Sequence, residues 1–570
     1  MALRLFDEHQ VRPVRALDGL WDFVTADERN GRDRLPTSYN RQILVPSAWE
    51  MLPELENYRG TAWLRTRVQG APGRRLRLAF GGVSHTGRVY IDGTFVGEHY
   101  DAFTPWAVVA PATATGEHEL VVEVDNSFGE HSALHIENDY FTYGGITRPV
   151  EAQLVPDCYI DRLCATPQRV KGNWQLPVRV RLCNLGRAKA TRHVRVACAG
   201  CTLELGRRTV GPGDCCEVEG TLEVGAVAPW TAAEPALYRV SAALVDGDEV
   251  VDDLIDRVGF RELTVSGRKF LINGEPLHLR GYNRHEDHPQ FGCAIPVPAM
   301  ITDLELMRDL NCNFVRTCHY PNDMRFLDLC DELGVYVWEE SHARSVDFNH
   351  PKFREQITSS TTEMLDWHHN HPAIVIWGCL NECESETQAG RKQHKYVIDL
   401  IKKADRSRPV TFASNRGTKD LCLDLVDIVS WNRYDAWYGG GPQNLAPVNK
   451  QMLAWLHSTK TKSGGRNKPV IMSEFGAGGI YGYRHPRHAK WTEEYMAEVL
   501  DASLQLYLYD RRIVGAAIWQ FCDVRLTPEW WGGRPRNMNN KGTVDEYRRP
   551  KLCYDVVKRR LAEAAASRQQ

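Results

Sequence analysis

Hydrophobic and polar residues alternate in short runs along the first part of the chain. "WLRTRVQ", "RLRLAFGGV" and "HELVVEVDNS" each place apolar residues at every second position, and Gly, Pro or Asn separates the runs. Such a period of two is typical of half-buried β-strands. "IDGTFVG" adds a hairpin signal, because Asp-Gly favours a tight turn between strands. The pattern predicts a jelly-roll β-sandwich over residues 1–156.

A second stretch, residues 157–263, repeats this pattern with different spacing. "WQLPVRVRLCNLG", "HVRVACAG", "CEVEGTLEV" and "ALYRVSAALVDGDEVVDD" supply strands separated by turn residues. Their number and spacing predict a small immunoglobulin-like β-sandwich.

From residue 264 to 570 the pattern changes to buried strands that alternate with helices. Eight segments are nearly continuous apolar runs: "LHLRGYN", "CNFVRTCHY", "GVYVWEES", "AIVIWGCLNE", "PVTFASN", "DIVSWNRY", "PVIMSEFG" and "VGAAIWQF". Segments such as "PAMITDLELMRDL" and "TEEYMAEVLDASLQLYLYDRR" lie between them, with apolar residues at helical spacing. Eight βα units over this length predict a (β/α)8 TIM barrel, so the chain as a whole is expected to be multidomain.

Composition and charge narrow the classes of function. The chain has 570 residues, 43% of them hydrophobic and 25% charged, which is ordinary for a globular protein of three or four domains. The net charge of −3 gives no basic surface for nucleic acid or for an acidic membrane. We find no apolar core of a signal peptide and no run long enough to span a membrane, and we expect a cytoplasmic protein.

Sixteen cysteines are spread along the chain, most of them singly inside strand-like or helix-like runs. They are expected to be reduced, buried and small hydrophobes. Cys198, Cys201, Cys215 and Cys216 form one cluster in the sequence that could hold zinc. Because adjacent cysteines are unusual in zinc ribbons and "VACAGCTLELG" reads as plain strand, we expect no zinc there.

Two glutamates stand where barrel strands end. Asn381 and Glu382 end the fourth strand in "HPAIVIWGCLNECE", and Glu474 ends the seventh in "VIMSEFG". Active sites of TIM barrels form at the carboxyl ends of the strands, where these two strands face each other across the barrel. A pair of carboxyl groups across a cleft is the minimum equipment for glycoside cleavage. A strand-end Glu can also cap a helix or pair with an Arg, but two on opposite strands favour catalysis.

Further polar and aromatic residues are expected at the same face. Arg316 and His319 follow the second strand, and Tyr434 follows the sixth, while Trp519 falls in the eighth strand. An Arg beside a carboxylate favours the ionised form of the carboxylate, and an aromatic ring can provide an apolar surface under a sugar ring. Neighbours on a strand point in opposite directions, so either Glu339 or Glu340 faces the mouth, and Glu340 is the expected one.

The chain resembles glycoside hydrolase family 2, and most closely its β-glucuronidases. The resemblance covers nearly the whole chain and is carried by the motifs "GYNRHEDHP", "FVRTCHYP", "NHPAIVIWGCLNE", "WNRYDAWYG", "SEFG" and "NNKG". It implies that Glu382 is the general acid/base and Glu474 the nucleophile of a retaining enzyme, with Asn381 on the sugar 2-hydroxyl. Arg316, Glu340 and Tyr434 would support these groups, and His319, Tyr434, Tyr438 and Trp519 would contact substrate.

The resemblance also implies which sugar is bound. Asn539 and Lys541 form the N-x-K motif that meets the substrate carboxylate in β-glucuronidases, and Asp139 matches an acid that reaches from the first domain to sugar hydroxyls. An ammonium and an amide favour a C6 carboxylate over a neutral sugar. The alternative is that Lys541 is a surface residue beside Gly542.

Three departures from the family pattern bear on specificity. The segment "SHARSVDFNHPKFREQ" after the third strand is short, so the mouth is expected to be open to bulky or oligosaccharide aglycones. Cys383 follows the catalytic Glu where Pro is usual. Arg344 is an additional cation that either reads a carboxylate of different sugar stereochemistry or is a solvated loop residue.

We therefore predict a retaining β-glucuronidase that needs no metal or organic cofactor and acts on small-molecule or oligosaccharide glucuronides. A β-galacturonidase or dual hexuronidase is the alternative, and β-galactosidase or β-mannosidase activity is disfavoured by the N-x-K motif. A non-catalytic carbohydrate-binding protein would usually have lost Glu382 or Glu474, and both are present. By family resemblance we expect a homodimer or homotetramer.

Overall fold

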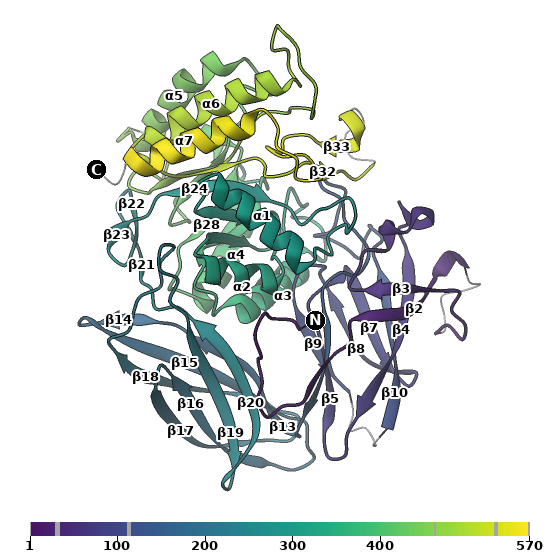
Figure 1. The fold of residues 1–570 in the computed structure, drawn as a ribbon. Coiled ribbons are helices and arrows are strands. Elements are labelled where there is room, and N and C mark those ends of the chain that lie inside the picture. Colours follow the sequence, from purple (N-terminus) through teal and green to yellow (C-terminus); the bar gives the residue numbers. More distant parts are fainter. Residues whose placement is uncertain (1, 29–34, 111–115, 461–462, 529–533, 568–570) are drawn as a thin grey trace.

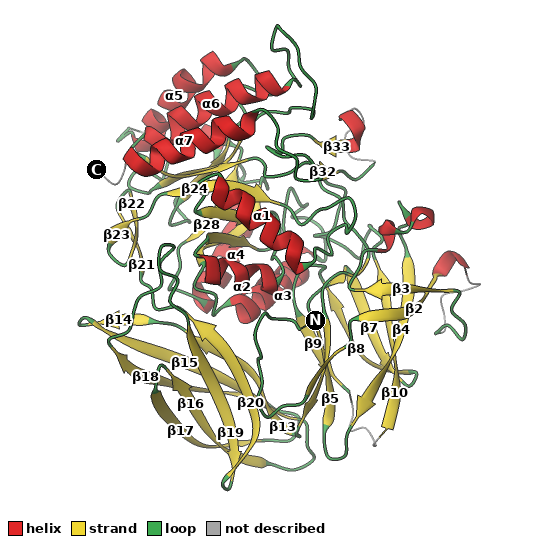
Figure 2. Ribbon diagram, in the orientation of Figure 1, coloured by secondary structure: helices red, strands yellow, loops and turns green. Residues whose placement is uncertain are grey.

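A computed structural model describes residues 2–28, 35–110, 116–460, 463–528 and 534–567. Two β regions lie side by side below a barrel, and the described α-helices all belong to the barrel (Figure 1, Figure 2). The multidomain class predicted from sequence is confirmed. Within the described ranges, no helix is both long enough and apolar enough to cross a membrane.

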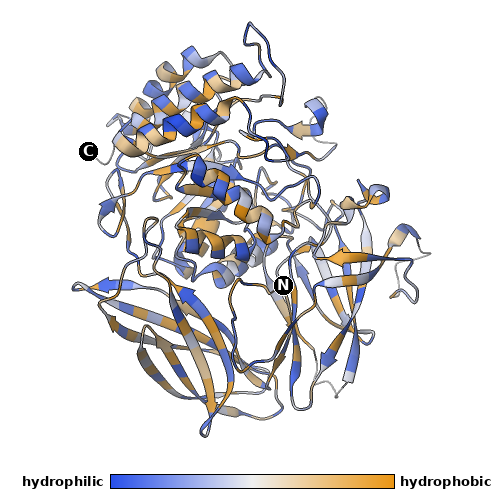
Figure 3. Cartoon of the chain, viewed as in Figure 1, coloured by the Kyte–Doolittle hydropathy of each residue, from blue (hydrophilic) through white to orange (hydrophobic). Residues whose placement is uncertain are grey.

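The amino-terminal β region packs two main sheets against one hydrophobic core. One sheet has the order β1-β12-β5-β9 and the other the order β3-β2-β4-β10-β7-β8, while β6 and β11 form a small third sheet. Hydrophobic and hydrophilic residues alternate along the strands, as the colours of Figure 3 show, and the hydrophobic ones supply the inner faces of the sandwich. The strands are β1 Val14–Ala16, β2 Gly19–Thr25, β3 Arg41–Val45, β4 Thr61–Gly70, β5 Arg75–Phe80, β6 Val83–Ser84, β7 Thr86–Ile91, β8 Thr94–Tyr100, β9 Trp106–Val109, β10 Gly116–Asp125, β11 Gly145–Ile146 and β12 Val150–Val155, with short 3-10 helices η1 Ala26–Glu28, η2 Trp49–Met51 and η3 Pro53–Leu55.

The second β region is a sandwich of two four-stranded antiparallel sheets. In one sheet β15 pairs with β13, β14 and β18, and the other has the order β17-β16-β19-β20. The strands are β13 Cys158–Ala165, β14 Gln168–Val170, β15 Asn173–Asn184, β16 Ala190–Cys198, β17 Cys201–Val210, β18 Cys215–Gly225, β19 Tyr238–Asp246 and β20 Glu249–Val258. The domain boundaries after residues 156 and 263 stay a prediction.

The barrel is closed by eight parallel strands in sequence order, as predicted. A small sheet of β21 Leu263–Ser266, β22 Lys269–Ile272 and β23 Glu275–Pro276 precedes it. The barrel strands are β24 Leu279–Arg284, β25 Phe314–Thr317, β26 Tyr336–Glu340, β27 Ile374–Asn381, β28 Val410–Ser414, β29 Val429–Asn432, β30 Val470–Phe475 and β31 Ile513–Ile518. Each is buried along its whole length or nearly so, which explains the continuous apolar runs in the sequence. Trp519 lies one residue beyond β31, so the prediction that placed it inside the eighth strand is wrong by that residue.

Helices surround the barrel, and their ends follow sequence signals. Asp323 caps α2 by accepting from the Arg325 amide, and Gly334 ends that helix in the left-handed conformation at φ 70°. The helices are α1 Val297–Asp309, α2 Met324–Leu333, α3 Phe353–His368, α4 Gln388–Ala404, α5 Leu445–His457, α6 Glu493–Tyr509 and α7 Cys553–Ser567. The short η4 Gly417–Lys419 stands between β28 and β29, η5 Pro442–Asn444 precedes α5, and η6 Pro535–Asn537 leads into the β32 Val524–Arg525 and β33 Met538–Asn539 pair.

The amino-terminal β region is tied to the carboxyl end of the barrel by buried polar contacts. Arg148 donates to Glu286 and to the carbonyl of Pro321, each at 2.8 Å. The segment between β10 and β11 reaches further, since the Thr527 hydroxyl donates to the carbonyl of Tyr140 at 3.0 Å. These contacts hold Asp139, the residue before Tyr140, at the barrel mouth.

The expectation that every cysteine is reduced is wrong at one pair. Cys183 and Cys215 form a disulfide, because β15 and β18 place them directly opposite each other. The other fourteen cysteines are free. Since Cys215 is bonded to Cys183, it does not join Cys198, Cys201 and Cys216 in a four-thiolate site.

Candidate active site

Glu474 is held by two donors from neighbouring parts of the barrel mouth. The Arg316 guanidinium donates to its Oε1 at 2.9 Å, and the Tyr434 hydroxyl donates to its Oε2 at 2.8 Å. Each oxygen of the carboxyl group thus accepts one hydrogen bond, and both donors favour its ionised form.

Arg316 is itself fixed from every side. It lies fully buried on β25, where its Nε and Nη2 donate to the two oxygens of Glu340 at 2.9 and 2.8 Å. The Asn283 and Asn381 side-chain oxygens each accept from it at 2.9 Å. All five donors of the guanidinium are thereby committed, so Arg316 presents a fixed partner to Glu474.

Glu339, the strand neighbour of Glu340, points the other way. Its Oε1 contacts His368 Nδ1 and accepts from the Asn322 amide, both at 3.0 Å. The alternation of side chains along β26 thus separates a carboxylate for the site from one for the helix layer, as the sequence predicts.

Glu382 follows β27 in an unusual backbone conformation. Its φ is 51°, the left-handed region that non-glycine residues rarely adopt. Its amide donates to the Ala413 carbonyl at 2.9 Å, and Arg416 donates to its carbonyl at 3.2 Å. Asn432, at the end of β29, donates to its Oε1 at 3.1 Å. Strained backbone that is held by its surroundings in this way is typical of functional residues.

The charges of the two glutamates are coupled. Burial raises the pKa of Glu474 to about 8, and the charge on Glu382 adds to the rise, while Arg316 and Tyr434 oppose it. Arg316 and Tyr434 thus favour the carboxylate form that a nucleophile needs, against burial and the neighbouring charge.

A cleft of about 800 Å³ opens over this pair. Asp139, Arg344, Tyr434, Tyr438, Trp519 and Lys541 line it together with Glu382 and Glu474. The Trp519 ring stacks on the His319 ring at 5.0 Å, so a buried imidazole backs the aromatic surface that faces the cleft. The cleft is large enough for a sugar ring with part of its aglycone.

Lys541 and Asn539 offer unused donors at one side of the cleft. Lys541 is 1% exposed and lies among the rings of Tyr434, Trp437 and Tyr438 at 5.9, 5.8 and 5.5 Å. No carboxylate of the described residues forms an ion pair with it, and the buried Asn539 Nδ2 has no hydrogen-bond partner there either. Burial lowers the pKa of Lys541 well below its usual range, and Arg534 adds to this. A bound anion would reverse that shift, so the arrangement favours a negatively charged ligand.

Arg344 is not a solvated loop residue. Its Nη2 lies 3.0 Å from Asp139 Oδ1 and 3.8 Å from Glu382 Oε2, and its Nη1 donates to Asn138 at 2.6 Å. Its side chain is 12% exposed. The short segment after β26 thus sets a cation between the first β region and the acid/base candidate.

The structure brings together most of the residues singled out from sequence, but not all of them line the cleft. His319, Asn381, Asn539, Arg316 and Glu340 are buried behind the lining residues. Among the described residues, the buried Nδ2 of Asn381 has no hydrogen-bond partner, so it is a donor available to a ligand. Tyr438 lies at the rim and is 59% exposed.

Sequence reasoning missed Asn432 and Arg534. Asn432 bridges Asn381 and Glu382, and its position at a strand end could have indicated it. Arg534 donates to Asn539 Oδ1 at 3.3 Å from an irregular segment, where no pattern in the sequence marks it.

Comparisons with known proteins agree with this geometry. Residues 263–565 match the description "Glycosyl hydrolases family 2, TIM barrel domain", and residues 158–261 match "Glycosyl hydrolases family 2". A family 2 β-galacturonidase from Eisenbergiella tayi, solved with galacturonate bound, is 41% identical, with a TM-score of 0.92 over 99% of both chains.

More distant relatives are named as β-glucuronidases. That of Streptococcus agalactiae is 25% identical over 95% of this chain and 96% of its own. That of Rattus norvegicus is 26% identical over 96% of this chain and 90% of its own. A Ruminococcus gnavus β-glucuronidase, solved with D-glucuronic acid, shares the fold, with a TM-score of 0.84 and 24% identity over 98% of this chain and 99% of its own.

Proposed function

The chain belongs to glycosyl hydrolase family 2, and on that premise we propose that this glycoside hydrolase cleaves β-D-glucuronides with retention of configuration. The observation that carries the proposal is that Lys541 lines the cleft without an ion-pair partner among the described residues, next to the unpartnered Asn539 Nδ2 and the two carboxyl groups. The β-glucuronidases among the relatives support the same substrate class.

In the first step Glu474 attacks the anomeric carbon. Arg316 and Tyr434 aim its carboxylate and release it as charge moves to the new ester bond. Glu382 gives its proton to the glycosidic oxygen, so the aglycone leaves as a neutral alcohol. Asn432 occupies Oε1 of Glu382, which leaves Oε2 as the oxygen that carries the proton.

In the second step the glycosyl-enzyme is hydrolysed. Glu382 is now a carboxylate and takes a proton from water, whose oxygen attacks the anomeric carbon and displaces Glu474. Arg344, 3.8 Å from Oε2, stabilises the carboxylate form in this half of the cycle. The buried Nδ2 of Asn381 is the donor available to the sugar 2-hydroxyl as positive charge develops on the ring.

A second candidate is β-D-galacturonide hydrolysis, alone or beside glucuronide hydrolysis. The two uronic acids are epimers at C4. Their C4 hydroxyl therefore points in a different direction beside the C6 carboxylate and meets a different part of the cleft wall. Arg344 and Asp139 form an ion pair on that wall, and the relative at 41% identity is named as a β-galacturonidase.

A panel of p-nitrophenyl β-glycosides tests both candidates. We expect turnover of the glucuronide, the galacturonide or both, at kcat/KM values far above that of the galactoside. A galactoside turned over as well as either uronide would contradict the proposal.

We also propose a location, an oligomeric state and a chemistry without metal ions. Fourteen unpaired cysteines support a cytoplasmic location, which cell fractionation would test. Family resemblance supports a homodimer or homotetramer, which light scattering on the purified chain would test. The proposed chemistry needs no metal ion, so chelators should not lower the activity.

A further inference from the structure

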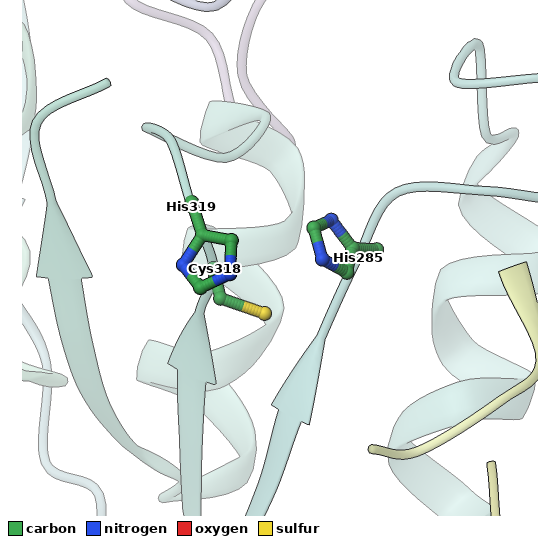
Figure 4. A group of neighbouring side chains, drawn as sticks. All are labelled: His285, Cys318 and His319. Carbon is green, nitrogen blue, oxygen red and sulfur yellow. The ribbon is translucent and has the colours of Figure 1, made fainter. Parts of the chain in front are cut away.

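Three side chains with metal-binding atoms meet beneath the cleft. His285 follows β24, and Cys318 and His319 follow β25, the next strand of the barrel. One ligand atom from each lies within 4.8 Å of the others, and their exposed fractions are 1%, 0% and 1%. In Figure 4 the Cys318 sulfur points toward the space between the two imidazole rings.

Both imidazoles have one nitrogen engaged and one unused. His319 Nδ1 lies 3.1 Å from Glu340 Oε1, and His285 Nδ1 lies 3.2 Å from the Tyr320 hydroxyl. The Nε2 atoms of both rings are buried without a hydrogen-bond partner in the described structure. His319 Nδ1 also lies 3.3 Å from Arg316 Nη2. In the tautomer that donates from Nδ1 to Glu340, Nε2 carries the lone pair, which is the usual arrangement behind a metal-bound histidine.

The donor set suits a particular class of cation. One sulfur and two imidazole nitrogens match zinc, whose bonds of about 2.3 Å to sulfur and about 2.0–2.1 Å to nitrogen place ligand atoms roughly 3.3–3.6 Å apart. The three donors therefore need to close by about 1 Å. Glu474 Oε1 lies 4.0 Å from His319 Nε2 and is thus the nearby carboxylate oxygen that could supply a fourth ligand.

In the two other clusters of this kind among the described residues, a histidine already pairs with a carboxylate of the same cluster. In the group of Asp101, His135 and His342, the Ala102 amide donates to His135 Nε2 at 3.2 Å. In the group of Asp328, Asp331 and His371, Asp328 is already paired with Arg4 at 2.8 Å. In the cluster beneath the cleft, the Nε2 atoms of both histidines have no partner among the described residues, so this cluster is the stronger candidate.

We propose that His285, Cys318 and His319 form a binding site for a thiophilic divalent cation, with zinc the best match, and that its occupation blocks turnover. The Cys318 thiol releases its proton to solvent as the metal–sulfur bond forms. The cation takes Glu474 as its fourth ligand, so the nucleophile is withdrawn from the sugar. The metal is thus an inhibitor that competes with substrate and has no part in catalysis.

Cys318→Ser is the central test, because a serine hydroxyl keeps the size of the side chain but is a poor zinc ligand. We expect zinc to inhibit the wild type in competition with substrate. The inhibition constant should rise on the order of 100-fold in Cys318→Ser, since loss of a metal-supporting group costs 10- to 100-fold or more. Cys379→Ser, at an equally buried cysteine of β27, is the matched control and should leave the inhibition constant unchanged.

Cobalt gives a readout that does not depend on activity. Cobalt(II) bound to a thiolate shows a sulfur-to-metal charge-transfer band, which we expect in the wild type and in Cys379→Ser and not in Cys318→Ser. This band separates the metal site from the proposed function, because it can be measured whether or not any uronide is hydrolysed.

Equal zinc inhibition of wild type and Cys318→Ser would overturn the proposal, as would a cobalt band that survives the substitution. Should Cys318→Ser fail to fold, His285→Gln carries the same comparison. It removes one of the two nitrogen ligands, and an unchanged zinc inhibition constant in that variant would equally contradict the site.

Discussion

Arg316 donates a 2.9 Å hydrogen bond to Glu474 although 158 residues separate them along the chain. The contact exists because β25 and β30 both end at the mouth of one closed barrel. The contact distinguishes the two glutamates, because Glu474 accepts a hydrogen bond from the Arg316 guanidinium and Glu382 does not.

Removing either glutamate should abolish normal turnover, but in different ways. Glu382→Ala should lower kcat/KM roughly 100- to 10,000-fold for a poor leaving group, the usual contribution of a general acid. With an acidic phenol as leaving group, this variant should still form the glycosyl-enzyme, and azide should restore the second step with retention. Glu474→Ala should show no burst with any leaving group. Indistinguishable burst kinetics in the two variants would mean that the roles are wrongly assigned.

Lys541→Ala should selectively lower the turnover of uronides. A charge-assisted contact in a partly desolvated cleft is worth about 2–4 kcal/mol, so kcat/KM for the preferred uronide should fall roughly 30- to 1,000-fold. Asn539→Ala should act in the same direction but less. A neutral galactoside lacks the carboxylate, and its weak turnover should be unchanged or rise.

Lys419→Ala is the control for that experiment, since Lys419 is an exposed lysine at the same end of the barrel. It should change neither rate. Equal losses on charged and neutral sugars in the Lys541 variant would show that the N-x-K motif is structural.

Arg344→Ala should separate the two uronic acids. Turnover of both should fall, because Asp139 loses its ion-pair partner at 3.0 Å. Galacturonide turnover should fall on the order of tenfold further, about 1.4 kcal/mol, if the guanidinium reads the C4–C6 side of the ring. Parallel losses on both substrates would limit Arg344 to positioning Asp139 and Glu382.

Glu50, in η2 of the first β region, should make stability depend on pH. It is 3% exposed, and burial raises its pKa from 4.5 to about 8. The folded chain therefore keeps a proton that the unfolded chain has released, so this residue's contribution to the free energy of unfolding falls as pH rises from 4.5 to about 8. Glu50→Gln has no such proton, and its stability relative to wild type should increase across that window and level off above it.

Urea denaturation at several pH values measures this difference. Glu54→Gln, at an exposed position of the neighbouring η3, is the matched control. A stability difference between Glu50→Gln and wild type that stays constant from about pH 5 to about pH 8 would contradict the burial argument.

The positions of Glu382 and Glu474 could be predicted because strand ends are visible in the sequence as the last apolar residues before a polar one. A barrel then brings all such ends together, so counting strands was enough. Asn432 follows the same rule and was within reach. Arg534 was not, because it precedes η6 outside any predicted element and meets the Tyr438 and Asn539 side chains only in the folded chain.

The Cys183–Cys215 disulfide and the position of Arg344 show a different limit of prediction from sequence. Two cysteines become partners through the register of β15 against β18, and register depends on the turn and on packing rather than on either residue. Arg344 pairs with Asp139 and donates to Asn138, which lies 206 residues away along the chain. Contacts between distant loops of this kind leave no local periodicity in the sequence.

The most direct test of the account is to trap the glycosyl-enzyme. The chain would be treated with the 2-deoxy-2-fluoro-β-D-glycosyl fluorides of glucuronic acid, galacturonic acid and galactose, and the labelled peptide would be sequenced by mass spectrometry. We expect one uronyl group on Glu474 and no label from the galactose reagent. A label on another residue, or equal labelling by the neutral sugar, would contradict the account.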